Sequence, residues 1–129
     1  MSICRYPERE EFEHYFYQIL IPEIEKREKK LKELAQETIE VLKRVGVLVM
    51  ALRSKLDLTR REFTVKSDLP LLWIDLVERG CSLPEDMTDE NVKKVDHIFH
   101  QIFPQAAHFS HFVNLDLLNL TGTHAPQSC

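Results

Sequence analysis

A heptad repeat of apolar residues in the first half of the chain constrains the fold more than any other feature. Seven positions share the a and d spacing of this repeat, and only the threonine among them is not apolar: Leu31, Leu34, Thr38, Val41, Val45, Leu48 and Leu52. Residues at this spacing lie on one face of an α-helix. Glutamate and lysine pairs at i, i+4 spacing precede the repeat and favour the same structure. The sequence therefore predicts one long helix over about residues 22–56.

The repeat has two interpretations. It lasts about three heptads, which is the minimum length typical of an intermolecular coiled coil. The stretch VGVLVMAL (45–52) is apolar on every face, which instead favours the longest helix of a bundle, buried in the core. Gly46, inside this stretch, permits the close approach of a neighbouring helix. We favour the bundle core, and the intermolecular seam stays open as the alternative.

Four further segments have helical periodicity. Residues 8–21 place Phe12, Phe16 and Ile19 on one stripe, and Pro22 is predicted to end this helix because proline lacks an N–H. The other helices are predicted over about residues 69–79, 89–103 and 105–119, whereas 57–70 is predicted to be a loop or a short extended piece. We therefore predict an all-α, single-domain bundle of about five helices over residues 1–120, with a flexible tail at 121–129.

Composition supports this fold class. The 129 residues include only three glycines and six prolines, too few for a turn-rich all-β fold. The apolar fraction of 43% and the charged fraction of 29% are ordinary for a globular protein. A chain of this length forms one domain and buries a core without disulfides or structural metal.

Charge and cysteine content limit the partners and the compartment. The net charge of −4 gives no overall basic field, and the basic stretch KREKKLK (26–32) is interleaved with glutamates, so nucleic acid is an unlikely partner. A helical nucleic-acid-binding regulator is retained as an alternative. The three cysteines form no metal or disulfide pattern, and no apolar run reaches the roughly 20 residues of a membrane span. We predict a soluble intracellular protein in the cytoplasm, with the nucleus as the open alternative.

Four of the six histidines lie within DHIFHQIFPQAAHFSHF (96–112). His97, His100, His108 and His111 are weak candidates for zinc or iron ligands, because imidazole binds both metals. They lie off the main apolar faces of their predicted helices, and no HExxH or Glu-x-x-His motif accompanies them. Solvent-facing histidines are the favoured interpretation, no cofactor is predicted, and a histidine-cluster metal-binding protein is a second alternative.

Motifs of catalysis are missing from the sequence. It contains no GxSxG, GxGxxG or GxxxxGK[ST] pattern, and no local signature joins Cys81 to a histidine. We therefore predict that the chain is not an enzyme and has no small-molecule substrate.

An excess of apolar and aromatic side chains points to association. Tyr15, Phe16 and Tyr17 are consecutive and cannot all face one side of a helix, which is typical of a partner surface. We predict a non-enzymatic protein–protein interaction or assembly module that forms a homodimer or joins a complex. The predicted interaction residues come from the heptad repeat and the first helix: Leu31, Leu34, Val41, Val45, Leu48, Phe12, Tyr15 and Phe16.

Overall fold

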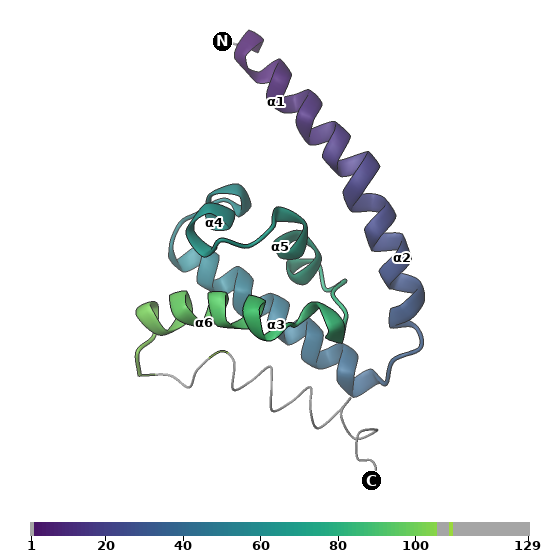
Figure 1. The fold of residues 1–129 in the computed structure, drawn as a ribbon, viewed down its shortest axis with the longest axis vertical. Coiled ribbons are helices and arrows are strands. Elements are labelled where there is room, and N and C mark those ends of the chain that lie inside the picture. The colour runs from purple at the N-terminus through teal and green to yellow at the C-terminus, as the bar shows by residue number, and fades with distance from the viewer. Residues whose placement is uncertain (1, 106–108, 110–129) are drawn as a thin grey trace.

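The computed structural model describes residues 2–105 and residue 109, and every regular element in this part of the chain is helical (Figure 1). The predicted all-α class is confirmed. The predicted tail at 121–129, and the predicted helix at 105–119 apart from Gln105 and Phe109, lie outside the described residues. The elements in chain order are α1 (Ser2–Tyr15), the π-helical turn η1 (Phe16–Leu20), α2 (Ile21–Leu31), α3 (Gln36–Lys55), α4 (Arg60–Ser67), α5 (Leu71–Glu78), the 3-10 turn η2 (Pro84–Asp86) and α6 (Asp89–Ile102).

The elements α1, η1 and α2 follow one another as a single helical rod, here called the N-terminal arm (Figure 1). The rod continues through Pro22, so the prediction that Pro22 ends the first helix is wrong, whereas a helix does start at this point as predicted. Pro22 lies in the first turn of α2, directly after the π-helical turn. There the N–H of Ile21 bonds to the carbonyl of Phe16, one residue further back than in an α-helix. Proline disturbs this position little, because it has no N–H to satisfy at a helix start.

The long helix predicted over 22–56 is divided in two. Helix α2 ends at Leu31 and α3 begins at Gln36, and the connection Lys32–Ala35, here called the hinge, holds neither glycine nor proline. Ala35 has extended backbone angles, with φ −63° and ψ 147°. Tertiary contacts of the arm override the local helix preference at this point.

Helix α5 is the centre of the remaining part of the molecule, here called the body (α3 to α6). All of its residues from Trp73 to Glu78 are buried. Helix α3 packs closely along it, because a Cβ on Gly46 would lie only 2.2 Å from the carbonyl oxygen of Val77. The close approach predicted at Gly46 is thus confirmed. The stretch VGVLVMAL is not buried on every face, since Val47 is 63% and Met50 38% exposed.

Helix α4 occupies the segment for which a loop or a short extended piece was predicted, and that prediction is wrong. Thr59 caps its start: its hydroxyl accepts the Glu62 N–H at 3.1 Å, and the Glu62 carboxylate accepts the Thr59 N–H at 2.8 Å. This reciprocal capping satisfies two backbone donors and stabilises a short helix. Phe63 then anchors α4, because its side chain is fully buried in the core.

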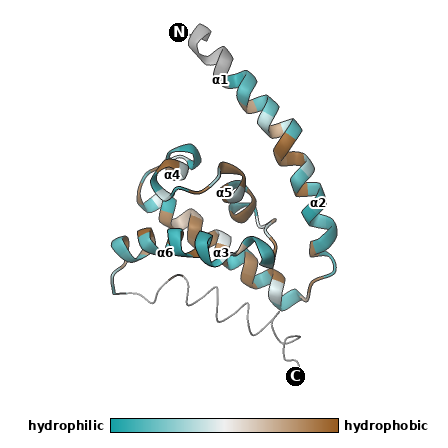
Figure 2. Cartoon of the chain, in the orientation of Figure 1, coloured by the Kyte–Doolittle hydropathy of each residue, from teal (hydrophilic) through white to brown (hydrophobic). Residues whose placement is uncertain are grey.

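The apolar faces of the body meet between α3, α5 and α6 (Figure 2). Helix α6 begins at Asp89, as the predicted range 89–103 has it, and its cap is Thr88, whose hydroxyl accepts the Asn91 N–H at 3.2 Å. Phe99, on α6, packs against Phe109 with ring centroids 6.0 Å apart. Within residues 2–105, no helix has the length and apolarity needed to cross a bilayer.

Candidate interaction site

The arm contacts the body through Tyr15 at the end of α1, through η1 and through α2, whereas the rest of α1 extends away from the other helices (Figure 1). Leu20, in η1, is 1% exposed and is the buried apolar residue of this junction. Two polar contacts flank it. The Tyr15 hydroxyl donates to the Asp75 carboxylate at 2.6 Å, and the Arg27 guanidinium binds the Asp86 carboxylate. The arm is therefore held by apolar contacts, of Leu20 and of the partly buried Leu31, together with two specific polar ones.

The first polar contact belongs to a charged network beneath η1. Asp75 accepts a second hydrogen bond, at 2.6 Å, from Nη1 of Arg60 on α4. Burial raises the pKa of Tyr15 above its ordinary value, and the hydrogen bond to Asp75 raises it further. Tyr15 therefore stays protonated and donates its hydrogen bond well into the alkaline range.

The network continues to Glu78, whose side chain has no solvent exposure. Arg53 donates two bonds to its carboxylate, at 2.8 and 2.9 Å, and Nε of Arg60 donates a third at 3.0 Å. The bonds to Glu78 raise the pKa of Arg53. The guanidinium groups of Arg53 and Arg60 thus face the carboxylates of Glu78 and Asp75, and Nε of Arg79 lies 3.9 Å from Asp75 as well. Each buried carboxylate therefore has a cationic partner where an unpaired charge would be costly.

The second polar contact joins α2 to η2. Arg27 donates two hydrogen bonds to Asp86, at 3.0 and 2.8 Å, and also pairs with Glu23 one turn away. The Asp86 carboxylate accepts the Leu83 N–H at 2.7 Å. The backbone carbonyl of Asp86 accepts the indole N–H of Trp73 at 2.8 Å. The hydrogen bond from Arg27 lowers the pKa of Glu23, and the bonds to Asp86 raise that of Arg27. The arm therefore binds a turn that the core itself positions.

Replacing Tyr15 by phenylalanine is expected to lower the free energy of unfolding by about 1–2 kcal/mol at neutral pH, because the Asp75 carboxylate loses a donor. The native pKa of Tyr15 is raised above its ordinary value. The contribution of the hydroxyl is therefore complete below pH about 10 and is lost as the pH rises beyond the unfolded pKa. Urea unfolding of wild type and Tyr15→Phe at several pH values measures the difference between their free energies of unfolding. This difference should become smaller at alkaline pH.

Tyr17→Phe is the matched control, because Tyr17 is 64% exposed. We expect this change to shift stability by less than about 0.5 kcal/mol at any of these pH values. If the difference in free energy of unfolding between wild type and Tyr15→Phe stays constant from neutral to strongly alkaline pH, the raised pKa of Tyr15 is contradicted.

The part of the arm around η1 carries exposed apolar side chains. Phe12 is 52% exposed, Tyr17 64% and Ile19 41%. The Phe12 and Phe16 rings stack with centroids 5.6 Å apart, and Phe16 meets Tyr17 edge-on at 5.1 Å. Of the predicted interaction residues on the first helix, Phe12 is exposed and Phe16 half-buried, whereas Tyr15 is half-buried and bonded to Asp75. These side chains form an apolar surface on a projecting helix, here called the aromatic face (Phe12, Phe16, Tyr17 and Ile19).

The predicted heptad seam lies largely inside one chain. Val41 is 5% and Val45 2% exposed, and both belong to the core of the body. Leu31, Leu34 and Leu48 are partly buried and pack against that core. The side chains of Val41 and Val45 therefore offer no surface to a second protein while the body is folded.

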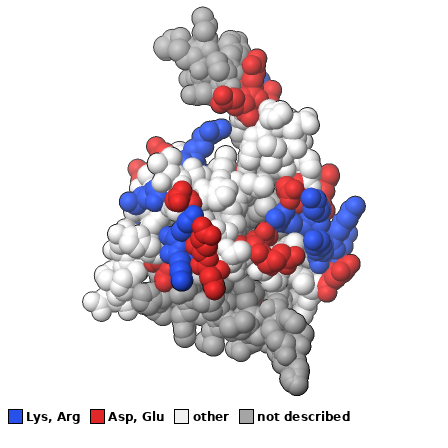
Figure 3. All heavy atoms as spheres, viewed as in Figure 1, with Lys and Arg blue, Asp and Glu red and all other residues white. Residues whose placement is uncertain are grey.

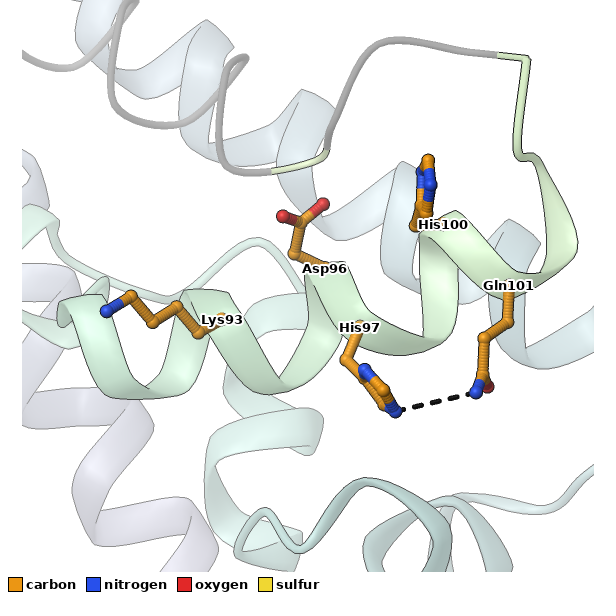
Figure 4. Close-up of a pocket in the computed structure, with 5 residues that line it drawn as sticks. All are labelled: Lys93, Asp96, His97, His100 and Gln101. Atoms are coloured by element: carbon orange, nitrogen blue, oxygen red, sulfur yellow. Dashed lines mark hydrogen bonds between the residues drawn. The ribbon is translucent and has the colours of Figure 1, made fainter.

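The candidate metal ligands that the structure describes do not converge. His97 and His100 are exposed on α6 and point to different sides of the helix (Figure 4). They border a surface hollow of about 350 Å³, and Nε2 of His97 lies 3.4 Å from the amide nitrogen of Gln101. His108 and His111 lie outside the described residues. Within the described part of the chain, no three His, Cys, Asp or Glu side chains are grouped to hold a metal ion.

Two further features bear on the alternative functions. Lys and Arg side chains gather on α2, but acidic side chains lie among them in the same view (Figure 3), and Nζ of Lys26 is 3.3 Å from the Glu23 carboxylate. A mixed surface of this kind attracts phosphate backbones weakly. Cys81 is half-buried, and burial, followed by the charge of Glu28, raises the pKa of its thiol. Its thiol is therefore mostly protonated at neutral pH, whereas the thiolate is the nucleophile.

No protein-family model, no curated protein and no solved structure matches the chain. The functional argument therefore rests on the surface of the arm and on its contacts with the body. Sequence reasoning missed the polar residues of these contacts, Asp75 and Asp86 on the body and Arg27 on the arm, and it also missed Glu78, which pairs with Arg53 and Arg60 inside the body. One signal was present, because Asp75 and Glu78 are the two acidic residues of the otherwise apolar helix LLWIDLVE.

Proposed function

We propose that this chain is a non-enzymatic protein–protein interaction or assembly module, and that it self-associates through the N-terminal arm. The aromatic face on the projecting arm carries the proposal. Single exposed apolar side chains are common on protein surfaces, but aromatic residues that adjoin one another are typical of the centre of an interface.

The size of these side chains supports the proposal. A buried aromatic side chain removes about 150–250 Å² from water, and each Å² contributes roughly 25 cal/mol. Burial of Phe12 and Tyr17 against a second protein would thus supply several kcal/mol, with Phe16 already holding both rings in place. Fixed rings lose little conformational freedom on binding, which favours association.

The charged side chains of α2 contribute in a different way. Salt bridges at the surface, such as that between Lys26 and Glu23, add little to stability but keep the arm soluble while its partner is absent. The odd number of cysteines, far apart in the sequence, supports placing the module in a reducing, intracellular compartment.

The mass of the protein in solution, measured by light scattering over a concentration series, tests the proposal. We expect wild type to move from the mass of one chain towards twice that mass as concentration rises. The double variant Phe12→Glu with Tyr17→Glu should stay at the mass of one chain, because both exposed rings are replaced by charged groups.

Val65→Glu is the matched control, because Val65 is an 84% exposed apolar residue of the body. It should associate like wild type, and circular dichroism should show unchanged helix content in all variants. A wild-type protein that keeps the mass of one chain at every concentration would contradict self-association. A double variant that still dimerises would remove the aromatic face from the proposal.

A further inference from the structure

The hinge is built from residues that prefer to be helical. Lysine, glutamate, leucine and alanine, the four residues of Lys32–Ala35, all rank among the strong helix formers. Ala35 is the N-cap of α3 and makes no side-chain capping bond, and alanine is among the poorest residues at such a position. The break between α2 and α3 is therefore not encoded by its own sequence.

The ends of α4 and the start of α6 differ from the hinge. Thr59 and Thr88 cap α4 and α6 through their hydroxyls, and α4 ends at Asp68 in the left-handed region with φ 61°. The C-cap of α2, Lys32, instead keeps helical angles, with φ −63° and ψ −20°. No left-handed residue stops α2, and no side chain starts α3.

Little of the hinge backbone departs from a helix. The N–H groups of Glu33 and Leu34 bond to carbonyls three residues back, at 3.0 and 3.1 Å, as in a 3-10 helix. Ala35, with ψ 147°, has left the helical region. Rotation of this ψ towards about −42°, with small adjustments beside it, would join α2 and α3 into one helix.

The contacts that hold the arm need not come from the same chain. They include the buried Leu20 of η1, the element that contacts α5, as well as Tyr15 with Asp75 and Arg27 with Asp86. Each of them joins an arm residue to a body residue across the junction. Once the hinge is straight, the arm of a chain points away from its own body, and both halves of the junction lose their partners.

We propose that the hinge straightens when two copies of this chain meet, and that each arm then occupies the arm site on the body of the other copy. The partner is a second copy of the chain because only that copy carries the same arm and the same site, so each exchanged junction reproduces the contacts of the monomer. Short connections that can extend are known to favour such exchange. Leu31, Leu34 and Val41 then lie on one continuous helical face through the former hinge. This inference rests on the proposed self-association and specifies its geometry.

Ala35→Pro tests the role of the hinge. The φ of −63° at Ala35 matches the value that proline imposes, so the bent hinge accepts the substitution. A straight helix does not accept it, because proline removes a hydrogen bond and collides with the preceding turn. We expect Ala35→Pro to remain at the mass of one chain under conditions in which wild type forms a dimer. Ala35→Gly is the matched control, because glycine is compatible with both the bent and the straight hinge. This variant should still dimerise.

Deletion of Glu33–Ala35 tests the reverse case, in which the bent hinge is prevented and the exchanged dimer is favoured. The shortened chain cannot fold back on its own body, so we expect a dimer that no longer dissociates on dilution. A folded monomer of this deletion variant, with the helix content of wild type, would overturn the exchange.

A mixing experiment tests which copy each arm binds. Arg27→Asp places a negative charge opposite Asp86, and Asp86→Arg places a positive charge opposite Arg27, so each variant alone has a repulsive junction. In an exchanged heterodimer, one junction joins the arm of the Arg27→Asp chain to the body of the Asp86→Arg chain, where opposite charges meet. The other junction joins an unchanged Arg27 to an unchanged Asp86, as in wild type. We expect each variant alone to give monomers and the mixture to give a dimer with one copy of each, identified by native mass spectrometry.

The outcomes separate the exchange from the proposed function. If wild type and Ala35→Pro form equal amounts of dimer, and mixing the Arg27→Asp and Asp86→Arg variants yields no additional dimer, the exchange is overturned. Self-association through the arm would still stand. Dimers that Ala35→Pro abolishes, but that the Phe12→Glu, Tyr17→Glu variant retains, would support the exchange and remove the aromatic face from the proposed function. A wild-type chain that stays monomeric at every concentration would overturn both.

Discussion

Replacing Glu78 by glutamine should destabilise the body by about 3–5 kcal/mol, the typical cost of removing one partner from a buried ion pair. The side chain keeps its shape, but Arg53 and Arg60 lose the carboxylate that accepts three of their hydrogen bonds. Glutamine also turns an NH₂ group towards these donors. Urea unfolding followed by circular dichroism at 222 nm measures the change.

A double-mutant cycle identifies the cause of this loss. Arg60→Gln combined with Glu78→Gln should cost less than the sum of the two single changes, because the excess positive charge is removed with its partner. Glu25→Gln, at an exposed position of α2, is the matched control and should change stability by less than about 0.5 kcal/mol. A loss below about 1 kcal/mol for Glu78→Gln would contradict the network as described, because it would mean that solvent compensates the arginines.

Gly46→Ala should destabilise the protein by about 1–3 kcal/mol, although alanine ordinarily stabilises a helix interior relative to glycine by about 1 kcal/mol. The new Cβ would lie 2.2 Å from the carbonyl oxygen of Val77. The atom it meets is backbone, which cannot rotate away as a side chain would. Helices α3 and α5 would have to separate, and the change should appear as a lower melting temperature.

Val47→Ala, at the next position of the same helix, is the control for this change. Val47 is 63% exposed, so alanine should leave stability unchanged or raise it slightly through its higher helix propensity. The two neighbouring substitutions to alanine therefore have opposite expected signs. A Gly46→Ala protein that melts above wild type would show that α3 and α5 do not approach as described.

Helices with a complete local signal could be predicted from the sequence. Helix α6 has the Thr88 cap and an apolar stripe that continues through Phe99, and it lies where the pattern placed it. The left-handed Gly80, with φ 76°, follows α5 directly after residue 79, where the predicted helix over 69–79 ends. The capping residues Thr59 and Glu62 of α4 were equally present in the sequence, but the short apolar pattern behind them hid the helix.

The arm and its junction could not be predicted in the same way. The bend at Ala35 depends on contacts between residues far apart in the chain, such as Tyr15 with Asp75, and no local pattern encodes it. Continuity past Pro22 depends on a π-helical turn, which has no simple sequence signature. The burial of Glu78 also became visible only with the fold, since its partners come from two other helices.

The π-helical turn has a consequence for how related chains could diverge. One turn of this kind adds a single residue to a helix, and so rotates everything before it by roughly 100° relative to everything after it. Arg27 lies after the turn and Phe12 before it. Loss of one residue between them would leave α2 in its place on η2 while presenting a different side of α1 to the surroundings. Binding specificity could then change by a single insertion or deletion, with no substitution in the body.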